Sequence, residues 1–160
     1  MNKNTYIILV SIFSILILSL FSAYYIEFVL GHKPCKLCIY QRYPYFISIL
    51  LLINIFFLKK LARLCLLFLS LVSLFGSILA FYHFGIEQGF FSESIVCEAP
   101  ILDENLTKKE ILKQLSEKAI SCKIVTFKVF GLSLASINTI FSFVLFCIFI
   151  RLFKNYEINR

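Results

Sequence analysis

The chain alternates between long apolar runs and shorter polar intervals. Four apolar runs each hold about 20 residues or more, enough to cross a hydrocarbon core of roughly 30 Å as a helix. These runs are Tyr6–Leu30, Ile39–Leu58, Leu64–Phe84 and Phe130–Ile150. The pattern therefore predicts an all-α membrane protein, a four-transmembrane-helix bundle that forms a single domain over residues 1–160.

The polar intervals indicate which ends of the helices share a side of the membrane. A short loop (31–38) and a long segment (85–129) alternate with a tight turn (59–63). Because the number of spans is even, both termini and the turn lie on one side, and the two loops lie on the other. The basic residues of the terminal side are Lys3, Lys59, Lys60, Arg63, Arg151, Lys154 and Arg160. The compact group of Lys59, Lys60 and Arg63 in the turn favours cytoplasmic termini and periplasmic loops. Two lysines of the short loop and six of the long segment count against this orientation.

The first apolar run begins only a few residues from Met1, as the apolar region of a signal peptide would. It is longer than the roughly 7–15 residues of such a region, and no small-x-small cleavage site follows it. We expect this run to remain as an uncleaved membrane anchor.

The long segment contains one pattern typical of a helix. Thr107 and Glu110 have the spacing of a capping box, and Leu112, Leu115 and Ala119 follow at helical intervals. We expect a short amphipathic helix here. It either lies on the membrane surface and keeps the flanking cysteines near the short loop, or touches nothing.

Composition agrees with a membrane protein and excludes one class of partner. The chain is 60% hydrophobic, with a mean hydropathy of +0.89 and only 16% charged residues. Its net charge of +7 is spread among the apolar runs and builds no basic, aromatic-interleaved face. We therefore expect no binding of nucleic acid, and we assign most of the charge to loops beside anionic lipid headgroups.

The six cysteines divide into two groups. Four of them, Cys35, Cys38, Cys97 and Cys122, fall on the predicted periplasmic side, where disulfides form and persist. Cys35 and Cys38 form a Cys-x-x-Cys pair, a spacing that often lowers the pKa of one thiol. A structural disulfide or half of a metal site has the same spacing. A zinc site would usually have a second close pair, whereas Cys97 and Cys122 are 25 residues apart, so we predict no metal site.

The two remaining cysteines, Cys65 and Cys147, lie within the third and fourth apolar runs. Free cysteine is among the most buried residue types and behaves as a small hydrophobe. We therefore expect both residues to pack in the bundle and to take no part in redox chemistry.

Arg42 strengthens the redox interpretation of the Cys-x-x-Cys pair. It follows Cys38 by four residues at the start of a predicted helix, so both residues share one helix face. A guanidinium there favours a thiolate and also bonds a quinone oxygen that gains negative charge. The alternative is that Arg42 only reaches the lipid headgroups. Further polar residues near the same membrane face are Glu27, His32, His83, Glu87 and Gln88.

Three separate motifs of the chain resemble the bacterial disulfide-bond formation protein B (DsbB) family. They are Cys35-Lys-Leu-Cys38-Ile-Tyr-Gln-Arg42, then Tyr82-His83-Phe-Gly85-Ile-Glu87-Gln88-Gly89, and Phe130-Gly131-Leu132-Ser133-Leu134-Ala135. Together with four spans and two loop cysteine pairs in the same order, the resemblance covers nearly the whole chain. Two departures are the absence of Trp and the Ser121 that precedes Cys122, where many relatives have a proline.

The resemblance implies a thiol:quinone oxidoreductase of the bacterial inner (cytoplasmic) membrane. In that family the pair matching Cys97 and Cys122 faces a periplasmic thioredoxin-like (DsbA-like) dithiol oxidase, and the pair matching Cys35 and Cys38 passes electrons to ubiquinone or menaquinone. Arg42 matches the family's quinone-site arginine, and we assign His83 to the same site. We weighed two alternatives: a vitamin K epoxide reductase-like enzyme, whose Cys-x-x-Cys lies late in the chain, and a non-catalytic membrane protein with structural disulfides.

Overall fold

The computed structural model describes residues 3–92, 97, 121–123, 125, 127–129 and 131–158. In chain order its elements are α1 (Lys3–Phe28), α2 (Lys36–Tyr40), α3 (Arg42–Phe57), the short 3-10 helix η1 (Lys59–Leu61), α4 (Ala62–Glu87), β1 (Lys128–Val129), β2 (Leu132–Ser133) and α6 (Leu134–Ile158). The amphipathic helix expected within residues 107–119 lies outside the described part of the chain.

Four helical segments are long and apolar enough to cross a membrane. They are Lys3–Phe28, Lys36–Phe57, Ala62–Glu87 and Leu134–Tyr156. The predicted all-α bundle of four transmembrane helices is therefore confirmed. α2 and α3 together make the second of these segments, with Gln41 between them.

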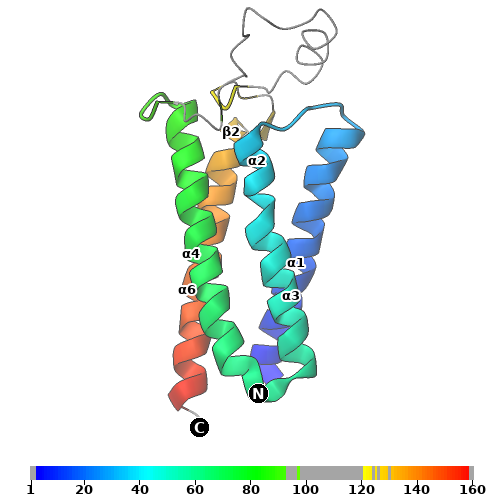
Figure 1. The fold of residues 1–160 in the computed structure, drawn as a ribbon. Helices are drawn as coiled ribbons and strands as arrows, with labels where there is room; N and C mark the ends of the chain where they lie inside the picture. Colours follow the sequence, from blue (N-terminus) through cyan, green and yellow to red (C-terminus); the bar gives the residue numbers. More distant parts are fainter. Residues whose placement is uncertain are drawn as a thin grey trace, which may run out of the picture.

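The four long segments run side by side and alternate in direction (Figure 1). Both chain ends and η1 lie at one end of the bundle, at the bottom of the view. At the other end, which we call the loop end, the segment after α1 crosses to α2 beside the β1–β2 hairpin. The cysteines of the Cys-x-x-Cys pair are thus far from the chain termini.

α4 is the helix that holds the bundle together. It packs along α6 and α3, and α3 also contacts α1. Its buried face carries small residues at the middle turns, including Ser73, Gly76, Ser77 and Ala80. Small side chains let helix backbones approach closely, which drives helix association in lipid, where burial of apolar surface contributes little. At Gly76 an added Cβ would lie only 3.3 Å from Cβ of Pro44 in α3.

The apolar core lies toward the end of the bundle that carries the chain termini. Its fully buried side chains include Leu9, Leu52, Leu69 and Phe149, one from each long segment. Many other large apolar side chains are exposed on the outer surface. Exposed apolar area of this extent is unusual for a soluble monomer, and hydrocarbon chains of lipid would cover it.

The two intramembrane cysteines differ in their surroundings. Cys65 is buried in the apolar core, as expected. Cys147 is exposed on the outside of α6, so the expectation that it packs in the bundle is wrong. Both positions lie in continuous apolar runs, and the turn of the helix decides which one faces inward.

The start of α6 differs from the apolar pattern for a local reason. The apolar run begins at residue 130, but the helix begins at Leu134. Gly131 has φ +83°, a left-handed conformation suited to the tight turn of the β1–β2 hairpin. In this hairpin Lys128 pairs with Ser133, and Val129 pairs with Leu132. The Ser133 hydroxyl then accepts the backbone N–H of Ser136 at 3.2 Å, which caps the new helix.

α4 continues past the end of its apolar run, to Glu87. Two hydrogen bonds close it in a Schellman arrangement: the Gly89 N–H donates to the Ile86 carbonyl, and the Phe90 N–H donates to the Gly85 carbonyl. The extra turn keeps Glu87 helical, four residues after His83. Both side chains therefore lie on the same side of α4, at the loop end.

Candidate redox site at the loop end of the bundle

Cys35 and Cys38 lie at the beginning of α2. Cys35 is the N-cap residue, and its Sγ accepts the backbone N–H of Cys38 at 3.2 Å. The Sγ atoms of Cys35 and Cys38 lie 2.9 Å apart, within hydrogen-bond distance, and both cysteines are free thiols. One tight turn thus holds two sulfurs close enough for a disulfide to form with little movement.

Cys35 is the more acidic thiol for reasons visible in its contacts. The hydrogen bond from the Cys38 thiol is the largest cause of a pKa lowered from the ordinary value of 9.0 to about 5. His83 adds a hydrogen bond and, when protonated, a favourable charge, and the Cys38 N–H adds one more hydrogen bond. Burial of Cys35 opposes these effects, but the net direction favours a thiolate at neutral pH.

His83 connects the dithiol to α4. It is buried, with 2% of its surface exposed. Its Nε2 lies 3.5 Å from Cys35 Sγ and 3.7 Å from Oε1 of Glu87. The other carboxylate oxygen of Glu87 is buried and has no hydrogen-bond partner among the described residues. A thiol, an imidazole and a carboxyl group therefore meet here with little access to water.

A chain of polar side chains continues from His83 into the bundle. Gln41 Nε2 lies 2.9 Å from His83 Nδ1, and Gln41 Oε1 accepts from Asn138 Nδ2 at 2.7 Å. Asn138 Oδ1 in turn accepts from the hydroxyl groups of Tyr45 and Ser142. With Gln41 Nε2 as donor, His83 Nδ1 is an acceptor, so a neutral imidazole carries its proton on Nε2. That proton faces the Cys35 sulfur.

Gln41 and Asn138 were not among the residues that sequence reasoning selected. A signal for them does exist, because a polar residue inside a membrane-spanning segment is rare and usually faces the bundle interior. The sequence alone does not show that residues 97 positions apart meet. The structure brings them together because α6 returns alongside the start of α3.

Arg42 lines the same cavity as Cys38 and also makes contacts that the helix-face spacing did not indicate. Its guanidinium forms an ion pair with Glu27 of α1, with an Nη1–Oε2 distance of 2.5 Å. The guanidinium carbon also lies 4.7 Å from the ring centroid of Tyr24. Arg42 is largely buried in this arrangement, so it joins α3 to α1 within the bundle.

A cavity of about 620 Å³ lies beside these residues. Its volume falls within the range of about 300–1,000 Å³ that is usual for small-molecule sites. The polar and sulfur-containing lining residues include Cys35, Cys38, Gln41, Arg42, His83, Glu87 and Asn138. Apolar lining comes from α1 and α6, including Ile15, Leu18, Ile26, Leu134 and Phe141. The residues thus suit a ligand with a polar head and an apolar body.

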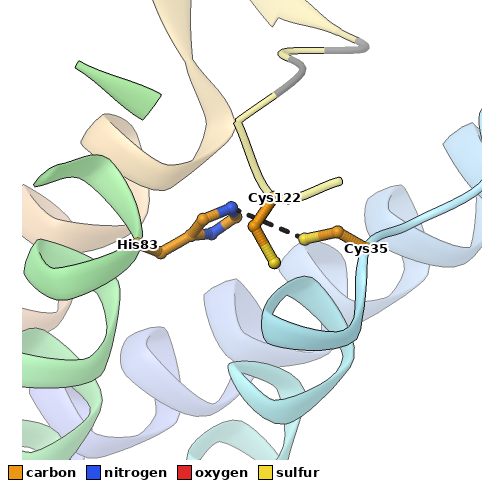
Figure 2. A group of neighbouring side chains, drawn as sticks. All are labelled: Cys35, His83 and Cys122. Atoms are coloured by element: carbon orange, nitrogen blue, oxygen red, sulfur yellow. Dashed lines mark hydrogen bonds between the residues drawn. The ribbon is translucent and has the colours of Figure 1, made fainter. Parts of the chain in front are cut away.

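The second cysteine pair packs against the first in one buried cluster. Cys97 and Cys122 form a disulfide, and each is 1% exposed. Sγ of Cys122 lies within 4.8 Å of both Cys35 Sγ and a ring nitrogen of His83. Figure 2 shows these three side chains converging from α4, from the segment before α2 and from the segment before β1. All four cysteines selected from the sequence therefore gather at one place, together with His83.

Comparisons with known proteins agree with this arrangement. Residues 4–152 match the family described as disulfide bond formation protein DsbB. The chain is 28% identical over 140 residues to a protein of Rickettsia prowazekii (strain Madrid E) named "Uncharacterized protein RP370", covering 86% of this chain and 81% of that protein. No solved structure matches the chain. Because the family match spans nearly all of the chain, this membrane protein belongs to the DsbB family of disulfide bond formation proteins.

Proposed function

We propose that this protein is a thiol:quinone oxidoreductase of the bacterial inner membrane. It reoxidises a periplasmic thioredoxin-like dithiol oxidase and delivers the electrons to ubiquinone or menaquinone. Electrons enter at Cys97 and Cys122 and leave through Cys35 and Cys38. Membership of the DsbB family supports a role in disulfide-bond formation and sets aside the alternative of a vitamin K epoxide reductase-like enzyme.

One observation carries this proposal. The Cys122 sulfur of the loop disulfide lies within 4.8 Å of Cys35 Sγ, and Cys35 in turn borders the cavity. A loop disulfide, a dithiol and a ligand-sized cavity are therefore adjacent, in the order that an electron relay requires. Disulfides with a purely structural role have no need of that order.

The relay balances in two exchanges. The partner's thiolate attacks Cys97, and its second thiol completes the partner's disulfide, which leaves Cys97 and Cys122 as thiols with two electrons and two protons gained. The Cys122 thiolate then attacks Cys35 of a Cys35–Cys38 disulfide and releases the Cys38 thiolate. Attack of Cys97 on Cys122 restores the loop disulfide and releases Cys35. The result is the combination in the structure, a Cys97–Cys122 disulfide with free Cys35 and Cys38.

The second half of the reaction returns Cys35 and Cys38 to a disulfide. A quinone in the cavity would accept two electrons and two protons from the dithiol. We assign Cys38 as the thiol that gives up the electrons, Arg42 as the group that favours negative charge on a quinone oxygen, and His83 as a second polar contact. Their positions along the cavity wall support these roles.

The proposed relay also fixes an orientation. Thiol exchange with a periplasmic partner requires the loop end of the bundle to face the periplasm, so both termini are cytoplasmic. The basic turn at residues 59–63 supports the same orientation.

Anaerobic turnover tests the proposal. Purified protein in detergent is supplied with a reduced thioredoxin-like oxidase and with ubiquinone or menaquinone, and quinol formation is followed. We expect turnover by the wild type, none by Cys35→Ser, Cys38→Ser, Cys97→Ser or Cys122→Ser, and near-normal rates for Cys65→Ala and Cys147→Ala. Folded protein with intact disulfides and no turnover with either quinone would favour the structural alternative.

A further inference from the structure

We infer that the fully reduced protein has a binding site for a thiophilic divalent cation such as Zn²⁺, made by Cys35, Cys122 and His83. The site exists only after the Cys97–Cys122 disulfide has been reduced. It goes beyond the proposed electron relay, because it predicts a ligand that the relay does not use.

The three groups lie close enough together to hold one metal ion. One ligand atom from each residue lies within 4.8 Å of the other two, and all three residues are buried. With Zn–S bonds of about 2.3 Å and Zn–N bonds of about 2.0–2.1 Å, sulfur and nitrogen on a tetrahedral ion are separated by roughly 3.6 Å. The Cys35 Sγ to His83 Nε2 distance is 3.5 Å. These two ligands need almost no movement to bind the ion, and Cys122 Sγ must move slightly toward them.

The fourth side of the site is also suited to a cation. Glu87 lies next to His83, and its buried Oε2 has no hydrogen-bond partner among the described residues. A buried carboxylate oxygen without a hydrogen-bond partner is costly, and a nearby divalent ion compensates it. Cys38 Sγ lies 2.9 Å from Cys35 Sγ. A fourth ligand from Glu87 or Cys38 requires a side-chain movement, because neither belongs to the group of ligand atoms that lie within 4.8 Å of one another.

The redox state of Cys122 controls the site. In the structure Cys122 is bonded to Cys97, and a disulfide sulfur is a poor ligand compared with a thiolate. A dithiol, or a phosphine together with water, supplies the two electrons and two protons that convert Cys97 and Cys122 to thiols. The Cys122 thiolate is then the third ligand, and its proton is released when the metal binds.

The polar chain behind His83 can support metal binding without losing a hydrogen bond. A metal on Nε2 requires the proton of His83 on Nδ1, where it needs an acceptor. If the side-chain amides of Gln41 and Asn138 both turn over, Gln41 Oε1 accepts from Nδ1, and Gln41 Nε2 donates to Asn138 Oδ1. Asn138 Nδ2 then donates to the hydroxyl groups of Tyr45 and Ser142. Every contact of the chain on the Nδ1 side is kept and only its direction changes, while the metal takes the place of the Nε2 contact with Cys35 Sγ.

A cation in this site has a consequence for the relay. Both sulfurs that the proposed exchange joins, those of Cys35 and Cys122, would be held by the same ion, and neither could attack a disulfide. The cation would therefore trap the fully reduced protein. This consequence rests on the proposed function, whereas binding of the cation does not.

Titration with Co²⁺ tests the binding itself. The probe is Co²⁺ added anaerobically to detergent-purified full-length protein reduced with a phosphine. We expect thiolate-to-metal charge-transfer bands and the intense visible bands of tetrahedral Co²⁺, saturating at one ion per chain and removed by Zn²⁺. Untreated protein with its loop disulfide intact lacks the Cys122 thiolate and should bind Co²⁺ more weakly by more than about 100-fold.

Two matched variants decide which residues bind the metal. Cys97→Ser and Cys122→Ser both remove the loop disulfide, but only Cys122 belongs to the site. We expect reduced Cys97→Ser to bind as the wild type does. Cys122→Ser, Cys35→Ser and His83→Ala should weaken binding by more than about 100-fold, beyond the effect of losing an outer-shell contact.

The inference is overturned if the reduced wild type gives no charge-transfer bands, or if Cys97→Ser and Cys122→Ser weaken binding equally. Because neither partner nor quinone is present, the result does not depend on whether the relay turns over. Conversely, a protein that turns over but binds no Co²⁺ refutes only the metal site.

Discussion

At the scale of single residues, the acidity of the Cys35 thiol depends on its neighbours. Hydrogen bonds from Cys38 and His83 lower its pKa to about 5. An acid is mainly in its charged form above its pKa, so a lowered pKa extends the thiolate to lower pH. The Cys35 thiolate should therefore persist from neutral pH down to about pH 5, where an ordinary thiol is protonated throughout.

The rate at which a small alkylating reagent modifies Cys35 measures this pKa. In fully reduced protein with a chelator present, and with modification at Cys35 identified by mass spectrometry, we expect the rate to rise with pH through a midpoint near 5. Cys38→Ala removes the largest cause of the shift and His83→Ala removes two of the other causes, so both variants should move the midpoint upward. A wild-type midpoint near the ordinary value of 9.0 would contradict the hydrogen bonding described here.

Asn138 is a second residue with a testable contribution, because three side chains depend on it. Asn138→Leu leaves Gln41, Tyr45 and Ser142 without their shared partner. Side-chain hydrogen bonds between membrane helices contribute roughly 0.6–2 kcal/mol, so we expect the free energy of unfolding in mixed micelles to fall by about 1–2 kcal/mol. Asn54→Leu is the matched control, because Asn54 is exposed and its side chain bonds the Leu50 carbonyl of its own helix. Equal losses in both variants would argue against the polar chain.

Sequence reasoning at this scale found the residues with local signatures. The Cys-x-x-Cys spacing and the position of Arg42 are readable in eight residues. The Glu27–Arg42 ion pair, the Gln41–Asn138 contact and the approach of Cys122 to Cys35 join distant positions. Periodicity carries no information about such pairs, since it describes one helix at a time.

At the scale of elements, apolar length predicted that four helices exist, and local backbone chemistry set where they end. α6 starts at Leu134 because Gly131 turns the hairpin and Ser133 caps the helix. α4 continues to Glu87 because Gly89 and Phe90 supply its closing hydrogen bonds. Each boundary differs by a few residues from the predicted one. The longer α4 places His83 and Glu87 on the same side of the helix.

The packing of α4 against α3 gives a prediction at this scale. Gly76 lies so close to Pro44 that even a Cβ would be 3.3 Å from it, so Gly76→Leu forces the two helices apart. Overpacking of this kind costs roughly 1–3 kcal/mol, and we expect a corresponding loss of stability in mixed micelles. Ser14→Leu serves as the control, because Ser14 is exposed on α1 and a leucine there meets lipid. A stable Gly76→Leu protein would show that the close approach is not required.

At the scale of the whole molecule, the fold brings together cysteines that are distant in the sequence. An even number of spans places residues 31–38 and 85–129 at the same end, which the sequence alone indicates. It does not indicate that Cys122 reaches the buried space between Cys35 and His83. Because a pair separated by 25 residues lacks the usual zinc spacing, the sequence also offered no reason to expect the metal site inferred above.

Orientation in the membrane is the property on which all of this chemistry depends, because disulfides persist on the periplasmic side and are reduced in the cytosol. Lys33 and Lys60 are exposed at opposite ends of the bundle, so cysteines placed there report the two sides. In a background without the six native cysteines, we expect a membrane-impermeant maleimide to label Lys33→Cys in intact spheroplasts and Lys60→Cys only after lysis. The two variants introduce the same change at the two ends, so any difference between them comes from sidedness. Labelling in the reverse order would place Cys35, Cys38, Cys97 and Cys122 in the reducing cytosol, where the proposed relay has neither an oxidised loop pair nor its partner.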